Sequence, residues 1–255
     1  MVYQWDNITK TGKPNIYLAI NSGSNQFIPL VSNLIIQQGA LLVGGGSTQC
    51  IPMFLHEGEQ TLNNLTDWGL QQFTTHYKDN TITKENIFHY VYAVLHHPAY
   101  RKKYELNLKR EFPRIPLNDN FWQWAKWGRQ LMDIHINYEK AALYNLQRKD
   151  TLTDAAAKAK LKAFKPEGRI EIDSHTELTG IPAIAWNYKL GNRSAIEWIL
   201  DQYKEKKPGD PTIAEKFNSY KFADYKEQVI DLIQRVCTVS VQTMEIVNSM
   251  PSSPS

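Results

Sequence analysis

Three consecutive glycines followed by two hydroxyl side chains, Gly44 to Thr48, form the first candidate for chemistry in the sequence. Glycine-rich turns let backbone N–H groups surround a phosphate. A Walker loop, however, closes on Gly-Lys-Ser/Thr, and a dinucleotide-binding turn needs a third glycine three residues after the second. No lysine follows Gly46, and Gln49 stands where that third glycine belongs. The run therefore predicts a tight hairpin or a close backbone contact.

Histidine and cysteine side chains are the other candidate ligands and nucleophiles. His89 and His96 lie seven residues apart, so on one helix face they would be separated by two turns, about 11 Å, too far for one metal ion. His135 lies on an apolar helix stripe and Cys237 between valines, which predicts core positions for both. No His-Glu-x-x-His, Gly-x-Ser-x-Gly or Pro-Pro sequence occurs. We therefore predict no catalytic residue, no metal ligand and no cofactor.

Basic and aromatic side chains alternate between residues 101 and 129, here called the basic segment. Residues 81–150 hold 12 basic and 7 acidic side chains, a net charge of +5, whereas residues 1–80 and 208–255 each carry −2. The basic side chains of the segment are Arg101, Lys102, Lys103, Lys109, Arg110, Arg114, Lys126 and Arg129. Such mixing suits phosphate contacts and base stacking. It equally fits a solvated helix face whose lysine and arginine stems cover an aromatic core.

Short apolar runs separated by turn residues make the first 60 residues β-rich. The runs are 15–20, 27–31, 40–43 and 50–55. Pro29 and Pro52 lie inside two of them, and because proline cannot donate to a sheet, they predict edge strands or bulges. Residues 63–78 show no clear period and are interpreted as a linker.

From Thr83 onward the apolar spacing becomes helical, with Thr83 as the first N-cap. The predicted helices are 83–97, 99–110, 120–146, 194–206 and 224–248. The prolines at 113 and 116 predict an extended stretch over 112–117. Residues 169–172 are predicted to form a strand, and residues 151–163 a polar helix or a surface loop. The fold class is α+β: a β-rich subdomain, 1–80, followed by a mainly helical subdomain with a few short strands, 81–255.

Composition limits the class of protein and its compartment. The chain has 255 residues, 42% of them hydrophobic, and a net charge of +3, which is typical of a folded domain. No apolar run approaches the ~18 residues of a membrane span, and the N-terminus lacks the basic and apolar regions of a secretory signal. Two distant cysteines favour a reducing compartment. We expect a cytoplasmic protein without a membrane partner.

Three stretches of the sequence are similar to a known family. They are NIFHYVYAVLHHPAYRKKYELNLKREFPRIPL at 86–117, FWQWAKWGRQLMDIHINYE at 121–139, and residues 179–244, which begin TGIPAIAWNYKLGNRSAIEWIL. Together with GGGSTQCIPMFL at 44–55, they resemble the C-terminal target-recognition region of type ISP restriction-modification enzymes. In these single-chain bacterial proteins a nuclease, a helicase-like ATPase and an adenine-N6 methyltransferase precede that region. No Walker loop or methyltransferase loop occurs here, so the chain is expected to be a fragment or a free-standing piece.

The resemblance implies recognition of double-stranded DNA, with the methyltransferase and helicase-nuclease domains of a parent chain as further partners. On this reading the basic segment faces phosphates. Candidates for base contacts are Arg114, Asn192, Arg193 and Gln49. Arg114 and Arg193 fit equally well as buried arginines of structural ion pairs. The alternative functions are a stand-alone nuclease or hydrolase, and a domain that only docks against the methyltransferase.

Overall fold

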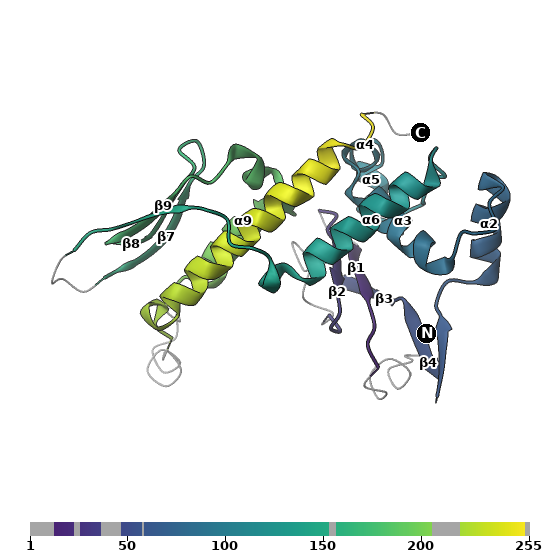
Figure 1. Ribbon diagram of the computed structural model, residues 1–255, viewed down its shortest axis with the longest axis horizontal. Coiled ribbons are helices and arrows are strands. Elements are labelled where there is room, and N and C mark those ends of the chain that lie inside the picture. Colours follow the sequence, from purple (N-terminus) through teal and green to yellow (C-terminus); the bar gives the residue numbers. More distant parts are fainter. Residues whose placement is uncertain are drawn as a thin grey trace. The chain divides into compact units, whose positions relative to one another are not determined.

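The computed structural model describes residues 13–22, 26–36, 47–57, 59–152, 157–205 and 220–252 (Figure 1). It divides into two compact units, unit 1 comprising residues 1–136 and 246–255, and unit 2 comprising residues 137–245. Both units contain helices and strands, in agreement with the predicted α+β class. Residue 80, the predicted subdomain boundary, lies inside unit 1 in the turn before α3 (Lys84–His96).

The sheet of unit 1 is antiparallel, in the order β2-β1-β3. Its strands are β1 (Tyr17–Ser22), β2 (Pro29–Ser32) and β3 (Ser47–Pro52). Pro29 and Pro52 lie on the two edge strands, opposite Ile20 and Tyr17, which confirms the prediction drawn from their missing N–H groups. A hairpin of β4 (Phe54–Glu57) and β5 (Gln60–Asn63) follows. The predicted strand at 40–43 and the glycines at 44–46 lie outside the described residues.

Residues 67–77 form helix α2 (Asp67–Tyr77), so the prediction of a linker over 63–78 was wrong. Thr66 caps the helix, its side chain accepting a hydrogen bond from the Gly69 N–H at 3.1 Å. No residue of α2 is fully buried; it rests on the core through the partly buried Leu70, Phe73 and Tyr77. That narrow, half-exposed apolar face explains the absence of a clear period in the sequence.

Helix α3 begins as predicted at Thr83, which forms a capping box with Asn86. The predicted helix over 99–110 is instead two short helices, α4 (Pro98–Lys103) and α5 (Glu105–Leu108), separated at Tyr104. The next helix, α6 (Phe121–Ile136), ends ten residues before the predicted 146. Beyond it the chain forms the short 3-10 helix η1 (Tyr138–Lys140) and bonds to a distant helix instead: Tyr144 N–H donates to the Gln234 carbonyl at 3.2 Å.

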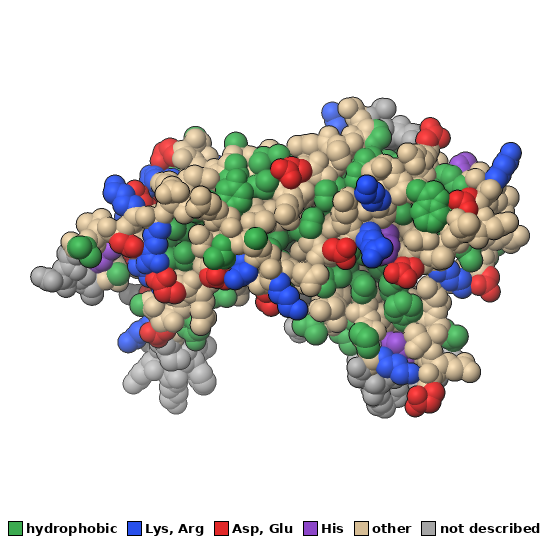
Figure 2. All heavy atoms as spheres, viewed as in Figure 1, with side chains coloured by type: hydrophobic (Ala, Val, Ile, Leu, Met, Phe, Trp, Pro, Cys, Tyr) green, Lys and Arg blue, Asp and Glu red, His purple; other side chains and the backbone are tan. Residues whose placement is uncertain are grey.

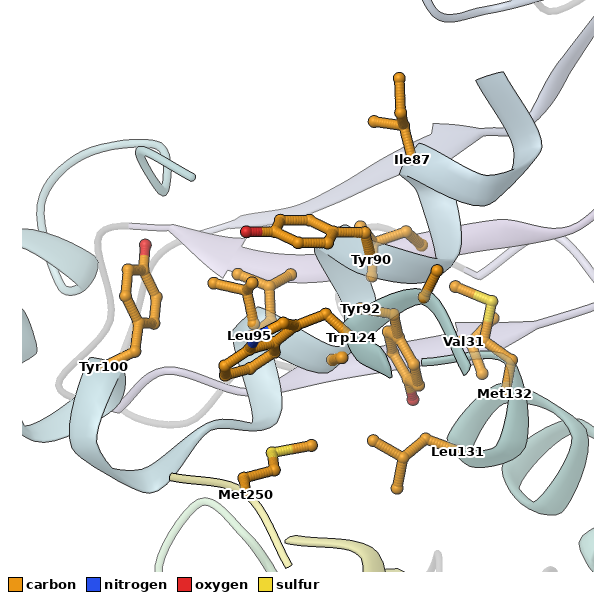
Figure 3. Close-up of a cluster of buried hydrophobic side chains, with 14 of the residues drawn as sticks. Val31, Ile87, Tyr90, Tyr92, Leu95, Tyr100, Trp124, Leu131, Met132 and Met250 are labelled. Atoms are coloured by element: carbon orange, nitrogen blue, oxygen red, sulfur yellow. The ribbon is translucent and has the colours of Figure 1, made fainter. Parts of the chain in front are cut away.

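The core of unit 1 is the interface between α3 and α6 (Figure 3). The apolar stripe on which His135 was placed is buried along α6, at Phe121, Trp124, Ala125, Gly128, Leu131, Met132 and His135. The ring centroids of Tyr90 and Trp124 lie 6.2 Å apart across this interface (Figure 3). At Gly128 an added Cβ atom would lie 1.7 Å from the His89 carbonyl oxygen, so glycine permits the close approach of the two helices.

Unit 2 contains a four-stranded antiparallel sheet in the order β6-β9-β8-β7. The strands are β6 (Gln147–Asp150), β7 (Ala159–Phe164), β8 (Arg169–Asp173) and β9 (Thr176–Thr179). The predicted strand over 169–172 is confirmed as β8. The prediction of a polar helix or loop over 151–163 was wrong for 159–163. These residues belong to β7, which pairs with β8 through residues 159, 162, 163 and 164, although only Leu161 of the strand is fully buried. Residues 153–156 lie outside the described part.

The remaining elements of unit 2 are η2 (Ala183–Asn187), the hairpin β10 (Lys189–Leu190) and β11 (Arg193–Ser194), α7 (Ala195–Gln202), and η3 (Phe222–Tyr225). Helix α9 (Lys226–Asn248) confirms the predicted last helix and ends in unit 1. Ser194 caps α7 and forms a capping box with Glu197, as the predicted start at 194 requires. The helix ends at Gln202 rather than at 206.

Candidate nucleic-acid interface

Three tyrosine hydroxyls hold an extended stretch, residues 112–118, here called the strip. Tyr100 of α4 donates to the Arg114 carbonyl at 3.0 Å. Tyr90 of α3 donates to the Pro116 carbonyl at 2.7 Å, and Tyr77 of α2 donates to the Asn118 carbonyl at 2.6 Å. The bonded carbonyls belong to every second residue, which is the period of an extended chain. Three helices therefore fix the backbone of the strip along one side.

These hydroxyls remain protonated donors at neutral pH. Burial raises the pKa of Tyr100 to about 12. Burial likewise raises the pKa of Tyr90, and burial together with the hydrogen bond to Tyr90 raises that of Tyr77. Tyr90 also accepts a hydrogen bond from the Asn118 N–H at 2.6 Å, so its hydroxyl bonds the strip twice. Nothing in the sequence marks these tyrosines as a group, because the three helices that carry them meet only in the fold.

The strip exposes alternate side chains. The side chain of Arg114 is 93% exposed and Phe112 is 58% exposed, whereas Pro113 and Ile115 are half-buried. The Glu111 carboxylate lies 3.6 Å from the Arg114 guanidinium, an exposed ion pair of a kind worth about 0–1 kcal/mol. Arg114 is therefore not a buried arginine of a structural ion pair, which was one of its two interpretations from the sequence. A cavity of about 440 Å³ adjoins the strip, lined by Tyr100, Tyr104, Asn107, Leu108 and residues 111–116.

Helix α4 and the residues after it carry five basic side chains in different environments. Lys102 and Lys103 are exposed, as is Arg110. Arg101 is half-buried and donates from its guanidinium to the Phe27 carbonyl at 3.0 Å. Lys109 is paired with the Glu105 carboxylate at 2.7 Å. Because the Tyr100–Arg114 hydrogen bond brings the strip against α4, the exposed cations lie on neighbouring segments.

Helix α6 contributes Lys126 and Arg129, both exposed and three residues apart, hence on one helix face. Phe121 and Trp124 belong to the buried stripe of α6. Of the two tryptophans outside that stripe, Trp122 donates to the Asp79 carboxylate at 2.8 Å, and Trp127 is partly buried against the core. Figure 2 shows basic and acidic side chains interspersed on the face in view.

The remaining predicted base contacts lie elsewhere. Gln49 is half-exposed on the edge strand β3 of unit 1. Asn192 is exposed in the turn between β10 and β11 of unit 2. Beside it, the Arg193 guanidinium lies 2.9 Å from the Asp201 carboxylate and 5.4 Å from the centroid of the Trp198 ring. Arg193 therefore has the ion-pair partner that its structural interpretation requires, although it is not fully buried.

Five histidines are buried, among them His96 and His135. His135 Nδ1 lies 2.7 Å from the Tyr92 hydroxyl, and His96 Nδ1 lies 2.9 Å from the Tyr92 carbonyl, which confirms the hydrogen-bonded core position predicted for His135. Burial lowers the pKa of His96 to about 4 and that of His135 well below its usual value. Cys237 is fully buried, as predicted. Within the described ranges, no three His, Cys, Asp or Glu side chains group as metal ligands would.

Residues 1–232 match the family model of the type ISP C-terminal specificity domain. The chain belongs to this family. Its resemblance to type ISP target-recognition regions is thereby confirmed. A comparison of this specificity domain with curated proteins finds no match. None of the helices described for it is both long and apolar enough to cross a membrane.

Solved structures of larger proteins contain a region similar to this specificity domain. It is 48% identical to part of the protein in the cryoEM structure of a DrdV–DNA complex, with a TM-score of 0.89, covering 98% of this chain and 26% of that one. For a nuclease-deletion mutant of the type ISP enzyme LlaGI in complex with a DNA substrate mimic, the identity is 27%, the TM-score 0.70, and the coverage 95% and 22%. The ATP-dependent type ISP enzyme LlaBIII bound to DNA shares the fold, at 22% identity and a TM-score of 0.74, covering 96% and 16%. The specificity domain thus spans about a quarter of the DrdV chain.

Proposed function

We propose that this specificity domain recognises a particular sequence of double-stranded DNA for a bacterial restriction-modification enzyme, and that other domains methylate and cleave. The observation that carries the proposal is the 48% identity, over 98% of the chain, to a protein solved in complex with DNA. Membership of a family of specificity domains supports the same role. The proposed partners besides DNA are the methyltransferase and helicase-nuclease domains of a longer chain, and the proposed compartment is the bacterial cytoplasm.

Phosphate contacts and base contacts are assigned to different side chains in this proposal. The exposed cations Lys102, Lys103, Arg110, Lys126 and Arg129 lie against phosphates, where each neutralised phosphate adds to affinity and to its salt dependence. Arg101 and Lys109 approach the DNA phosphates too, although both side chains already have partners within the protein. Arg114, Asn192, Arg193 and Gln49 are the proposed base contacts, because their side chains offer paired donors or a donor with an acceptor.

A binding selection tests the proposal. The purified chain is mixed with a pool of duplexes carrying a randomised segment, and the bound fraction is sequenced and retested over a range of salt concentrations. We expect enrichment of one short target, with affinity that falls steeply as salt rises. Absence of duplex binding even at low salt would instead favour a domain that only docks against the methyltransferase. Cleavage of plasmid DNA by the chain alone with Mg²⁺ would favour a nuclease.

A further inference from the structure

We propose that Arg114 discriminates a guanine of the target, and that the tyrosine hydroxyls beneath the strip position it for this task. The inference rests on the proposed function. It adds the side chain that contacts the base, the base that it recognises, and the residues that hold this side chain in place.

The backbone of the strip is unusually well held for an exposed segment. Its carbonyls at 114 and 116 accept hydrogen bonds from the buried Tyr100 and Tyr90. Pro113 and Pro116 restrict the chain further, since each fixes its own φ angle and disfavours helix in the residue before it. Ile115 packs against the core of unit 1 on the inner side. The position of the Arg114 Cα atom is therefore determined by several independent contacts.

On the outer side of the strip, the Arg114 side chain is exposed to solvent. Among the described residues, Arg114 has one ionic neighbour, Glu111 at 3.6 Å, beyond the distance of a good charged hydrogen bond. By contrast, Arg101 already donates to a carbonyl at 3.0 Å, and the Arg193 guanidinium lies 2.9 Å from a carboxylate. A rigid backbone that presents an open guanidinium suits a contact that depends on geometry as well as on charge.

Guanine is the base that fits this chemistry. The planar fork of arginine donates two parallel hydrogen bonds to the O6 and N7 acceptors of guanine in the major groove, and adenine offers a donor in place of O6. Phe112, two residues earlier and also exposed, adds apolar surface of the kind that contacts a thymine methyl group. A phosphate contact would need neither the fixed backbone nor the neighbouring phenyl ring.

Substitutions that keep charge but change geometry test the inference. In Arg114→Lys one donor group replaces the bidentate fork. We expect a roughly 5- to 150-fold loss of discrimination at one G·C pair of the selected target, with the salt dependence unchanged. Tyr100→Phe removes the hydroxyl under Arg114 and should lower discrimination at that same pair roughly 2- to 10-fold. Pro113→Ala loosens the strip without touching the core, so it tests positioning even if Tyr100→Phe fails to fold.

Two control variants separate this effect from general ones. Lys102→Gln should weaken binding to every duplex and reduce the salt dependence while leaving the base preferences intact. Tyr138→Phe removes an exposed hydroxyl, bonded to the Glu139 carboxylate, and should change neither quantity.

Distinct outcomes overturn the inference and the proposed function. If Arg114→Lys leaves discrimination at every base pair unchanged, Arg114 is a phosphate contact or a bystander and the inference is wrong, although the proposed function stands. If Arg114→Lys has the expected effect but neither Tyr100→Phe nor Pro113→Ala does, the positioning role is wrong. If the unaltered chain binds no duplex, the proposed function fails and the inference with it.

Discussion

Gly128 of α6 faces the carbonyl oxygen of His89 of α3 so closely that an added Cβ atom would lie 1.7 Å from it. No side-chain rearrangement relieves such a contact, because the obstructing atom belongs to the backbone. The two helices form the core of unit 1. Helix α3 also holds the strip through Tyr90, and α6 carries the exposed cations Lys126 and Arg129. The stability of the candidate interface therefore depends on a residue without a side chain.

Gly128→Ala should destabilise the protein by about 3 kcal/mol, at the upper end of overpacking costs, because α3 and α6 must separate to admit the methyl group. The measurement is the free energy of unfolding in urea. Gly69→Ala on α2 is the matched control: its nearest contact is the movable Leu65 side chain at 3.3 Å, so the gain in helix propensity makes it neutral or stabilising. Equal effects of the two substitutions would contradict the close-approach role of Gly128.

Buried neutral histidines predict a loss of stability in mild acid. Burial lowers the pKa of His96 to about 4 in the folded state, whereas the unfolded chain has the usual 6.5. The unfolded state therefore binds the proton first, and the stability present above pH 6.5 decreases as the pH falls towards 4, by on the order of 3 kcal/mol from this residue. His135 adds a change of the same sign.

Urea unfolding at pH 7 and pH 5 measures this dependence. His96→Gln removes the titrating group and keeps an amide able to donate to the Tyr92 carbonyl, so the slope of stability against pH should become shallower. An unchanged slope would show that other groups cause the acid sensitivity.

The ion pair between Lys226 and Asp173 should matter more than its exposed counterparts. The two side chains lie 2.7 Å apart, and that of Asp173 is 2% exposed. Burial alone would raise the pKa of Asp173, but Lys226 and the backbone N–H groups of His175 and Thr176 hold it below its usual value. Lys226→Met leaves a buried carboxylate without its cation, which should cost about 3 kcal/mol.

Lys84 provides the control for that substitution. Its pair with Asp67 has the same length, 2.7 Å, but the aspartate is 95% exposed, so Lys84→Met should change the free energy of unfolding by less than about 1 kcal/mol. If both lysines have the same effect, burial of the Asp173 pair does not set its strength.

The exposed lysines of α4, Lys102 and Lys103, should contribute to DNA affinity without contributing to base preference. Lys102→Ala combined with Lys103→Ala should lower affinity for all duplexes and reduce the slope of log affinity against log salt by about 2, roughly 0.9 for each lost phosphate contact. Arg101 is kept out of this pair, because its bond to the Phe27 carbonyl would mix a folding effect into the result. Binding titrations at four salt concentrations measure the slope, and an unaltered slope would remove α4 from the proposed DNA contact.

Several elements were predictable because their signals are local. The capping boxes Thr83–Asn86 and Ser194–Glu197 join residues three positions apart, and the burial of α6 follows from an apolar repeat within the helix itself. The prolines of β2 and β3 indicate edge strands because the missing N–H is a property of the residue itself. Family resemblance, too, was evident from short stretches of sequence.

Other features depend on partners that are distant in the chain. Residues 159–164 become strand β7 because β8 pairs with them, although their own pattern buries only Leu161 fully. Helix α6 ends at Ile136, and Tyr144, beyond that end, forms hydrogen bonds with Gln234 of α9, about ninety residues away in the chain.

The sequence by itself determined the α+β class, most helices, the basic segment and the family, since each of these depends on residues close together in the chain or on composition. Only the tertiary structure decided which cations are open to solvent, and that Arg114 is exposed on a strip held by Tyr77, Tyr90 and Tyr100. Those hydroxyls come from three different helices, and a hydrogen bond between residues so far apart in the chain exists only after the helices have packed.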